Sequence, residues 1–273
     1  MTKINKEFLL ELYQQGYTDK KLSEYFNSDI QHTHKIRRSL GLVGNKKSNL
    51  IKELNYEEKQ VLLGTVIGDT TLIKNTLTES THGSMMHGVK QKEYIEWKYS
   101  KLKRFINSVK FSSNFHKIRK VMEYRYRCDI TSNKCLDYFY YLFYDKDKKK
   151  NLNVEVINLL EPLGLAVWFM DDGSKTNSGG YYLHTNCFSK ENQEQIIKVL
   201  EEKFKLKINL HKTSKGAYIM YISARSAKQF ERLVSPFIIE SMKYKLHNKI
   251  YKYNMIEIEN NNHFTTYRGL NNK

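Results

Sequence analysis

Cysteine, proline and alanine are scarce in this sequence of 273 residues, which contains three, two and four of them. The three cysteines, Cys128, Cys135 and Cys187, are odd in number and fit no zinc-ligand spacing, which excludes a disulfide framework and favours a reducing compartment. No apolar run approaches the roughly 20 residues of a membrane span. The first residues, MTKINKEFLLEL, also lack the unbroken apolar core of a signal peptide. We therefore expect an intracellular protein that does not enter a membrane.

Positive charge, in contrast, is abundant: 46 Lys and Arg residues face 29 Asp and Glu residues, for a net charge of +17. Each phosphate that a protein neutralises releases counterions, so this excess favours a nucleic acid as partner. An A/T-rich genome is the alternative explanation, because it enriches Lys, Asn and Ile codons, and 23 residues are Asn. The compartments that fit are the cytoplasm of a bacterium or phage-infected cell and an organelle with such a genome. The 40% hydrophobic fraction excludes a disordered chain.

Residues 1–52 predict a small all-α module with a polar linker at its end (44–52). A first helix is expected to end at Gly16, a second to begin at Thr18 or Asp19, and a third to cover 30–40. The segment resembles a helix-turn-helix unit, in which the second helix of the pair enters the major groove of DNA. A helical cap with a basic solvent face is the alternative. The third helix is expected to expose three basic candidates for DNA contact: Lys35, Arg37 and Arg38.

The remaining chain contains a weak internal repeat, which divides it into residues 53–161 and 162–273. An apolar helix ends at Asp69 in the first copy and at Asp172 in the second, an offset of 172 − 69 = 103. Three further pairs of positions give offsets of 99, 95 and 94: His87 with Asn186, Lys150 with Lys245, and Tyr124 with Tyr218. Each copy reads as helix, two strands, helix, two strands and helix. We therefore predict an α+β fold of two pseudo-symmetric αββαββα halves.

Each half places an acidic residue at the end of its first apolar helix. Small residues on these helices, Gly64 and Gly68 in one and Gly164 and Ala166 in the other, would let the two backbones pack closely. Such packing would bring the two acids together. Paired carboxylates in a basic protein suit a hard cation such as Mg²⁺, which shares phosphate oxygens in phosphodiester displacement.

The strands carry the expected recognition surface. Side chains alternate in EYRYRCDI, so Glu123, Arg125, Arg127 and Asp129 share a polar face, while Tyr124, Tyr126, Cys128 and Ile130 share a face that can pack under helices. Arginine can bind guanine edges bidentately. A solvated surface is the alternative for each charge, and base stacking on unpaired strands is an alternative for the aromatics. The candidate contacts are Lys74, Asn75, Lys117, Arg119, Arg125, Arg127, Lys175, Asn177, Lys212, Lys215 and Arg225.

The two apolar helices carry a family resemblance. LLGTVIGDT (62–70) and LAVWFMDDG (165–173) resemble the two signature motifs of the LAGLIDADG homing endonucleases, in particular the single-chain, intron-encoded group. The second motif is highly specific, whereas the first departs from the pattern at Ile67 and Thr70. The resemblance covers about 57–250 and leaves the N-terminal module outside.

The resemblance implies two halves whose motif helices form the central interface and whose antiparallel sheets bind DNA. It implies that Asp69 and Asp172 bind Mg²⁺, for which Mn²⁺ is expected to substitute, with help from the backbone carbonyls of Gly68 and Asp171. It further implies catalytic lysines at Lys245 and at Lys150 or Lys149. His87 and Asn186 would belong to a water network at the site.

The implied activity is site-specific cleavage of double-stranded DNA at a long asymmetric target by a monomer. Each strand would be cut once, which leaves 3′ overhangs and promotes intron mobility. Two binding-only functions are the alternative: an RNA maturase, or a nuclease that has decayed into a DNA-binding protein.

Overall fold

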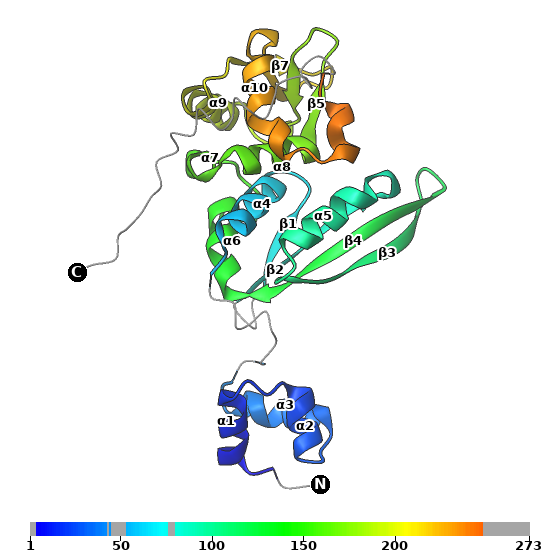
Figure 1. Ribbon diagram of the computed structural model, residues 1–273, viewed down its shortest axis with the longest axis vertical. Helices are drawn as coiled ribbons and strands as arrows, with labels where there is room; N and C mark the ends of the chain where they lie inside the picture. Colours follow the sequence, from blue (N-terminus) through cyan, green and yellow to red (C-terminus); the bar gives the residue numbers. More distant parts are fainter. Residues whose placement is uncertain (1–3, 43, 45–52, 76–79, 248–273) are drawn as a thin grey trace, which may run out of the picture.

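The computed structural model describes residues 4–42, 44, 53–75 and 80–247 (Figure 1). All but one residue of the predicted linker at 44–52 lies outside these ranges, as does the end of the second half after residue 247. The buried apolar residues form two separate clusters, one in the N-terminal helices and one in the rest of the described chain. In the described part of the chain, no helix is both long and apolar enough to cross a membrane.

The N-terminal module consists of α1 (Lys6–Gln14), α2 (Asp19–Tyr25) and α3 (Ile30–Ser39). The side chains of Asn5, Thr18 and Asp29 accept hydrogen bonds from the first backbone amides of the three helices. Gly16 and Gly41 follow the first and third helices with φ of +87° and +71°, a conformation that glycine adopts without steric cost. The three predicted helices are therefore confirmed. Their core is made by Ile4, Leu9, Leu12 and Leu22.

The predicted exposure of Arg37 is wrong. Its side chain lies in the interior of the module and donates to Asp19 at 2.9 Å and to the backbone carbonyl of Leu42. A guanidinium that joins α2 to the end of α3 in this way holds the module together. Lys35 and Arg38, on the other side of α3, are exposed as expected.

The two halves have the predicted order of elements. The first half consists of α4 (Tyr56–Ile67), β1 (Thr71–Asn75), β2 (Ser80–Gly88), α5 (Lys92–Lys101), β3 (Ile106–His116), β4 (Val121–Asn133) and α6 (Asp137–Phe143). The short helix α7 (Val154–Leu159) leads to the second half, which consists of α8 (Pro162–Asp172), β5 (Gly173–Lys175), β6 (Tyr181–Leu183), α9 (Lys190–Phe204), β7 (Ile208–Lys212), β8 (Tyr218–Ile222) and α10 (Ala227–Val234). A 3₁₀ segment, η6 (Glu240–Lys245), ends the described chain.

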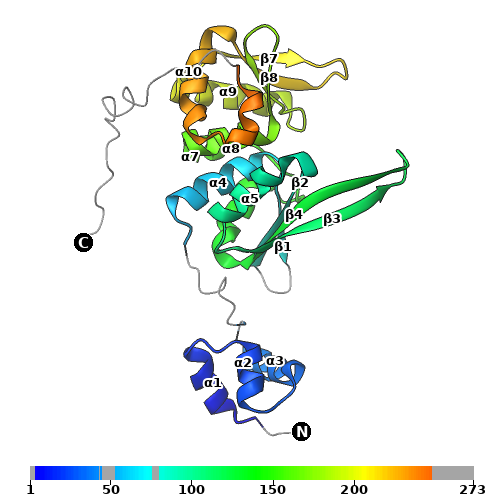
Figure 2. The same ribbon diagram turned by 45° about the vertical axis from the view of Figure 1, so that its right-hand side comes forward.

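The sheets repeat the same topology, because their strand orders are β1-β2-β4-β3 and β5-β6-β8-β7 and every pair is antiparallel. The prediction of two pseudo-symmetric α+β halves is therefore confirmed. The hairpins β3–β4 and β7–β8 project to the same side of the molecule (Figure 2). They differ in length: the first has strands of 11 and 13 residues, the second two strands of 5.

The motif helices α4 and α8 pack directly against each other, one from each half (Figure 1). A Cβ atom on Gly64 would lie 2.3 Å from the backbone oxygen of Gly164, and one on Gly68 would lie 2.5 Å from Cβ of Asp171. Only glycine permits such an approach. Gln60 reinforces the contact, because its side chain donates to the carbonyl of Leu159 and accepts from the amide of Glu161.

Only part of the predicted apolar face of β4 is covered by helices. Cys128 and Ile130 are buried, whereas Tyr124 is 50% exposed and stacks on the exposed ring of Phe111 across the hairpin. The prediction was wrong for Tyr124 because the hairpin extends beyond the helices that cover the rest of the sheet (Figure 2).

Lys74 lies on the same side of β1 as the buried Leu72, because side chains alternate along a strand. It pairs with Asp137 at 2.6 Å and lies over the ring of Tyr141, both on α6. In this structure the Lys74 side chain is therefore held against α6.

We expect Gly64→Ala to destabilise the protein even though alanine is the better helix former by about 1 kcal/mol. The added Cβ would meet the backbone of Gly164, and overpacking of this kind costs about 1–3 kcal/mol. Urea unfolding would measure the change. Gly88→Ala is the matched control, because a Cβ there meets nothing within 4 Å. Equal midpoints for the two variants would contradict the close packing.

Candidate active site

Two carboxylates lie where the motif helices meet the sheets. Asp69 follows the end of α4 and Asp172 is the last residue of α8. Burial, and then the neighbouring charges of Asp69 and Asp171, raises the pKa of Asp172 to about 7. Burial and the charge of Asp171 also raise the pKa of Asp69. Acids whose ionisation is hindered by burial and by neighbouring carboxylates form a site that favours positive charge.

A lysine reaches the end of each motif helix. The Lys150 ammonium donates to the carbonyl of Gly68 at 2.9 Å, and the Lys245 ammonium donates to the carbonyl of Asp171 at 3.1 Å. Gly68 and Asp171 each immediately precede a motif acid, so the two lysines occupy equivalent places in the two halves. Lys149, in contrast, is exposed, which leaves Lys150 as the first-half lysine at the site. Burial lowers the pKa of both site lysines, and the nearby acids oppose this effect.

The side chain of Asp171 points away from its own half. One carboxylate oxygen accepts hydrogen bonds from Lys98 at 2.6 Å and Tyr94 at 2.7 Å. The other accepts from Thr65 at 3.0 Å and from the backbone amide of Asp69 at 3.3 Å. A carboxylate has about four lone-pair directions, so this buried group is fully used by contacts with the first half. The Lys98 charge lowers the pKa of Asp171 despite its burial.

Lys98 forms the other member of this ion pair, and neither side chain has any exposed surface. Its ammonium contacts three groups: Asp171, Thr65 Oγ1 at 2.7 Å and His87 Nε2 at 3.0 Å. An ammonium has three protons to donate, so all three are used. Removing one partner of a buried pair leaves an isolated charge, which typically costs about 3–5 kcal/mol.

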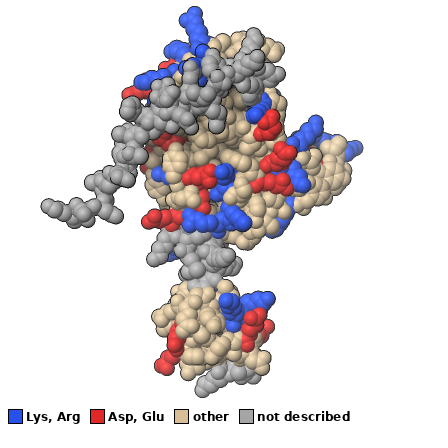
Figure 3. All heavy atoms as spheres, viewed as in Figure 1, with Lys and Arg blue, Asp and Glu red and all other residues tan. Residues whose placement is uncertain are grey.

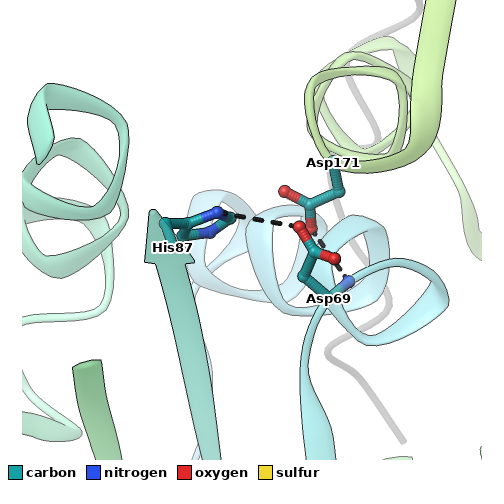
Figure 4. Close-up of side chains that lie close together, drawn as sticks. All are labelled: Asp69, His87 and Asp171. Carbon is teal, nitrogen blue, oxygen red and sulfur yellow. Dashed lines mark hydrogen bonds and ion pairs between the residues drawn. The ribbon is translucent and has the colours of Figure 1, made fainter. Parts of the chain in front are cut away.

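His87 is enclosed between Lys98 and the motif acid of its own half. Its Nδ1 lies 3.3 Å from Gln91 Oε1 and 3.6 Å from a carboxylate oxygen of Asp69 (Figure 4). Burial, and then the charge of Lys98, lowers the pKa of His87 to about 4, so the ring is neutral at physiological pH. The ring is thus held by neighbouring side chains.

Asp69, His87 and Asp171 offer ligand atoms that lie within 4.8 Å of one another, which is close enough to share a cation. The hydrogen bonds of Asp171 and the contact of His87 Nε2 with Lys98 occupy most of these atoms, however. Asp172 lies outside this group, but the charge of Asp69 reaches it, because burial and then Asp69 raise the pKa of Asp172.

Thr185, and not Asn186, occupies the position of His87 in the second half. The amide of His184 donates to the carbonyl of Asp172 at 2.9 Å, so Thr185 follows directly after this contact. The helices α5 and α9 begin at Lys92 and Lys190, and this offset of 190 − 92 = 98 pairs His87 with Thr185. Asn186 lies exposed in the next turn. The sequence offset of 99 was therefore one residue too long, because loop lengths differ between the halves.

The sequence profile of the LAGLIDADG DNA endonuclease family matches residues 59–230. This chain belongs to that family. The match begins and ends within the two halves, so the N-terminal module lies outside it.

Individual relatives carry both endonuclease and maturase names. A probable intron-encoded endonuclease 1 of Wickerhamomyces canadensis is 32% identical over 76% of this chain and 93% of that protein. Cytochrome b mRNA maturase bI2 of Debaryomyces hansenii is 29% identical over 74% of this chain and 79% of that protein. The solved structure of the homing endonuclease I-WcaI bound to its DNA recognition sequence superimposes with a TM-score of 0.69 at 26% identity, covering 77% of this chain and 97% of that one.

Sequence reasoning missed three residues whose side chains hydrogen-bond to Asp171: Thr65, Tyr94 and Lys98. A signal was present, because Tyr94, Lys98 and Leu102 are spaced four residues apart and Ile95 lies beside them. A lysine within an apolar helical stripe points to a buried ion pair. The sequence could not identify Asp171 as its partner, since the pair joins positions 73 residues apart.

Of the predicted contact residues, Arg125 and Arg127 lie on the polar face of β4, where they pair with Glu123 and Asp129. Asn75 is half-buried at the end of β1. Basic side chains gather on the projecting β3–β4 hairpin (Figure 3). The remaining candidates are exposed in hairpin turns, at strand ends and after β8: Lys117, Arg119, Lys175, Asn177, Lys212, Lys215 and Arg225.

We expect Asp172→Asn to raise the melting temperature of the metal-free protein at about pH 8 by several degrees. In a protein of this size, each kcal/mol of added stability raises the melting temperature by about 2–4 °C. The folded protein binds the Asp172 proton more tightly than the unfolded chain, because the pKa rises from 3.8 to about 7. The stability that Asp172 contributes is therefore complete below its unfolded pKa and is lost as the pH rises through about 7. The advantage of the Asn variant should thus shrink as the pH falls toward about 4.

Thermal melts in a chelating buffer across this pH range would measure the effect. Asp147→Asn, in an exposed loop, is the control and should follow the wild type at every pH. An advantage for Asp172→Asn that does not change with pH would contradict the assignment.

Proposed function

We propose that this protein is a site-specific homing endonuclease that cuts both strands of DNA and thereby promotes intron mobility. One observation carries the proposal: each motif helix ends in an acid, and a lysine contacts the carbonyl just before each acid. A protein that only binds nucleic acid has no need for two matched acid and lysine pairs at its central interface. Family membership supports the same conclusion.

We propose Mg²⁺ as the cofactor, with Mn²⁺ as a substitute. The fit comes from the donor set, because burial and then the charge of Asp69 raise the pKa of Asp172, and a divalent cation would relieve this repulsion. When bound, the cation would neutralise charge on the scissile phosphate and activate water for attack. The carbonyls of Gly68 and Asp171, each one residue before a motif acid, accept from the lysines and would help to hold the cation.

The protein's own residues would do the rest of the work. The ammonium groups of Lys150 and Lys245 lie at the two helix ends, where they would stabilise negative charge that develops on each phosphate. Each half would act on one strand, and hydrolysis would leave 3′ overhangs. Because the two sets of residues are fixed by packed helices, little reorganisation is needed when DNA binds.

The two sheets form the proposed DNA surface. They project to the same side of the molecule, as two sheets that follow one duplex would require (Figure 2). The hairpins differ in length, which supports a long asymmetric target. Both halves belong to one chain, so we infer that a monomer is sufficient. The similar structure of I-WcaI, which covers 77% of this chain, is bound to its DNA recognition sequence and supports this proposal.

The N-terminal module is proposed to add a helix-turn-helix contact to flanking DNA. Helices α2 and α3 are joined by a short turn, in which Asn27 has φ of +45°. The exposed face of α3 presents Lys35 and Arg38, whereas Arg37 serves the module's own core.

A binding-only function remains the second candidate, because one relative at 29% identity is an mRNA maturase. The presence of both acids and both lysines favours the nuclease. A cleavage assay separates the two functions directly.

We expect the purified protein to linearise a plasmid that carries the intronless host gene when Mg²⁺ or Mn²⁺ is added. Asp172→Asn should abolish cutting while leaving DNA affinity nearly unchanged, because it removes a cation ligand without altering the sheets. Gel electrophoresis and a binding titration would measure the two effects. Specific binding without any linear product in either cation would favour the binding-only function. Loss of binding together with cutting would give Asp172 a structural role.

We expect deletion of residues 1–52 to shorten the DNA footprint at one end and to weaken affinity. The deletion is feasible because the two hydrophobic clusters share no residue. Lys35→Ala with Arg38→Ala should weaken the salt dependence of binding. The slope of log binding constant against log salt concentration should fall in magnitude by about one unit for each phosphate that is no longer neutralised.

Lys20→Ala, on α2 and paired with Glu24 at the surface, is the control for this pair of substitutions. An unchanged footprint after the deletion would remove the module from the DNA interface.

A further inference from the structure

The buried ion pair of Lys98 and Asp171 occurs only once in the described part of a molecule that otherwise repeats itself. Asp171 and Gly68 are equivalent positions, each one residue before a motif acid. A side chain at residue 68 would collide with Asp171, since a Cβ there would lie 2.5 Å away. The interface therefore has room for one acid at this position, and its partners lie entirely in the first half.

The second half has a neutral arrangement at the corresponding place. Thr185, the counterpart of His87, donates to Gln193 at 2.6 Å. The Gln193 amide in turn donates to the backbone carbonyls of Thr185, Phe188 and Tyr218. Thus a buried lysine contacts His87 in the first half, whereas a neutral amide contacts its counterpart Thr185 in the second.

The contacts of Lys98 determine which nitrogen of His87 carries the proton. An ammonium only donates, so His87 Nε2 must accept the bond at 3.0 Å. In the neutral ring the proton is then on Nδ1, which faces Gln91 Oε1 at 3.3 Å and Oδ2 of Asp69 at 3.6 Å. The Nδ1–H hydrogen-bonds to Gln91 Oε1, and the positive end of this N–H dipole also lies near Oδ2 of Asp69, which favours the carboxylate rotation that places Oδ2 beside the ring.

We propose that Lys98 is a positioning residue that acts through His87 on the Asp69 side of the site, so that its loss slows cleavage of one DNA strand more than the other. This inference rests on the proposed nuclease function. Groups that orient a cation ligand without touching the cation typically change activity by about 10- to 100-fold. A support that exists in one half only must act unequally on the two strands.

The test measures both strands separately. A duplex that the wild-type protein cuts is labelled differently on its two 5′ ends, and single-turnover rates are followed at saturating protein with Mg²⁺. Lys98→Met should lower the rate on one strand by about 10- to 100-fold, with the other strand nearly unchanged and DNA affinity retained. Nicked duplex would then accumulate. Equal slowing of both strands, or an unchanged ratio, would overturn the inference.

Four further variants keep the test decisive. Lys101→Met is the matched control on the same helix, because Lys101 pairs with Glu57 at the surface and should leave both rates unchanged. If Lys98→Met does not fold, Lys98→Met with Asp171→Asn removes both charges together and should give the same strand bias.

His87→Gln leaves the ion pair intact and should also slow the same strand. Combining it with Lys98→Met should add nothing, because both act on one path. If the two substitutions slowed cleavage additively, the result would contradict the proposal.

A spectroscopic measurement separates this inference from the nuclease function. In protein labelled with ¹⁵N-histidine and free of DNA, the His87 signal, assigned by its loss in His87→Gln, should be that of a ring protonated at Nδ1. Lys98→Met should shift the proton partly to Nε2. A wild-type ring protonated at Nε2 would overturn the inference even if DNA is cut. The expected ring in a protein that cuts no DNA would leave the positioning intact and reject the nuclease.

Discussion

The close contact of the two motif helices is the constraint on which the rest of the structure depends. Backbone meets backbone at Gly64 and Gly164, so the helix ends are separated by less than any larger residue would allow. That separation places two carboxylates in one electrostatic environment and raises the pKa of each. It also leaves space for one further acid, Asp171, which crosses the interface to Lys98. Helix packing, acid chemistry and the joining of the two halves therefore have a single geometric origin.

The site combines features that oppose folding with features that support it. Two acids that repel each other, and two buried lysines with lowered pKa, make the metal-free protein less stable than an uncharged equivalent would be. The fully hydrogen-bonded pair of Lys98 and Asp171 lies directly behind them and fixes the positions of the surrounding side chains. Its net stabilisation is modest, because burial of two charges offsets their attraction. Its value lies in specifying one arrangement of the two halves.

Much of the fold was predictable from the sequence, because a repeated pattern of apolar helices and alternating strands leaves few ways to bury the same residues. Both halves, the N-terminal helices and the acids at the helix ends followed from local patterns. Three kinds of error have one cause. The exposure of Tyr124, the burial of Arg37 and the counterpart of His87 all depend on which distant element lies opposite. Periodicity identifies the face of a strand, but it does not tell where the covering helix ends or which loop is one residue shorter.

The projecting hairpin has a consequence for how the free protein behaves in solution. Strand β3 forms the edge of its sheet, and Phe111, Phe115 and Ile118 are exposed at 58%, 51% and 90% on the hairpin. An edge strand with apolar side chains is a template for pairing with another copy. Mutual repulsion from the net charge of +17 opposes that pairing. Added salt screens the repulsion over about 8 Å at physiological ionic strength and strengthens apolar association, so colloidal stability should fall as salt rises.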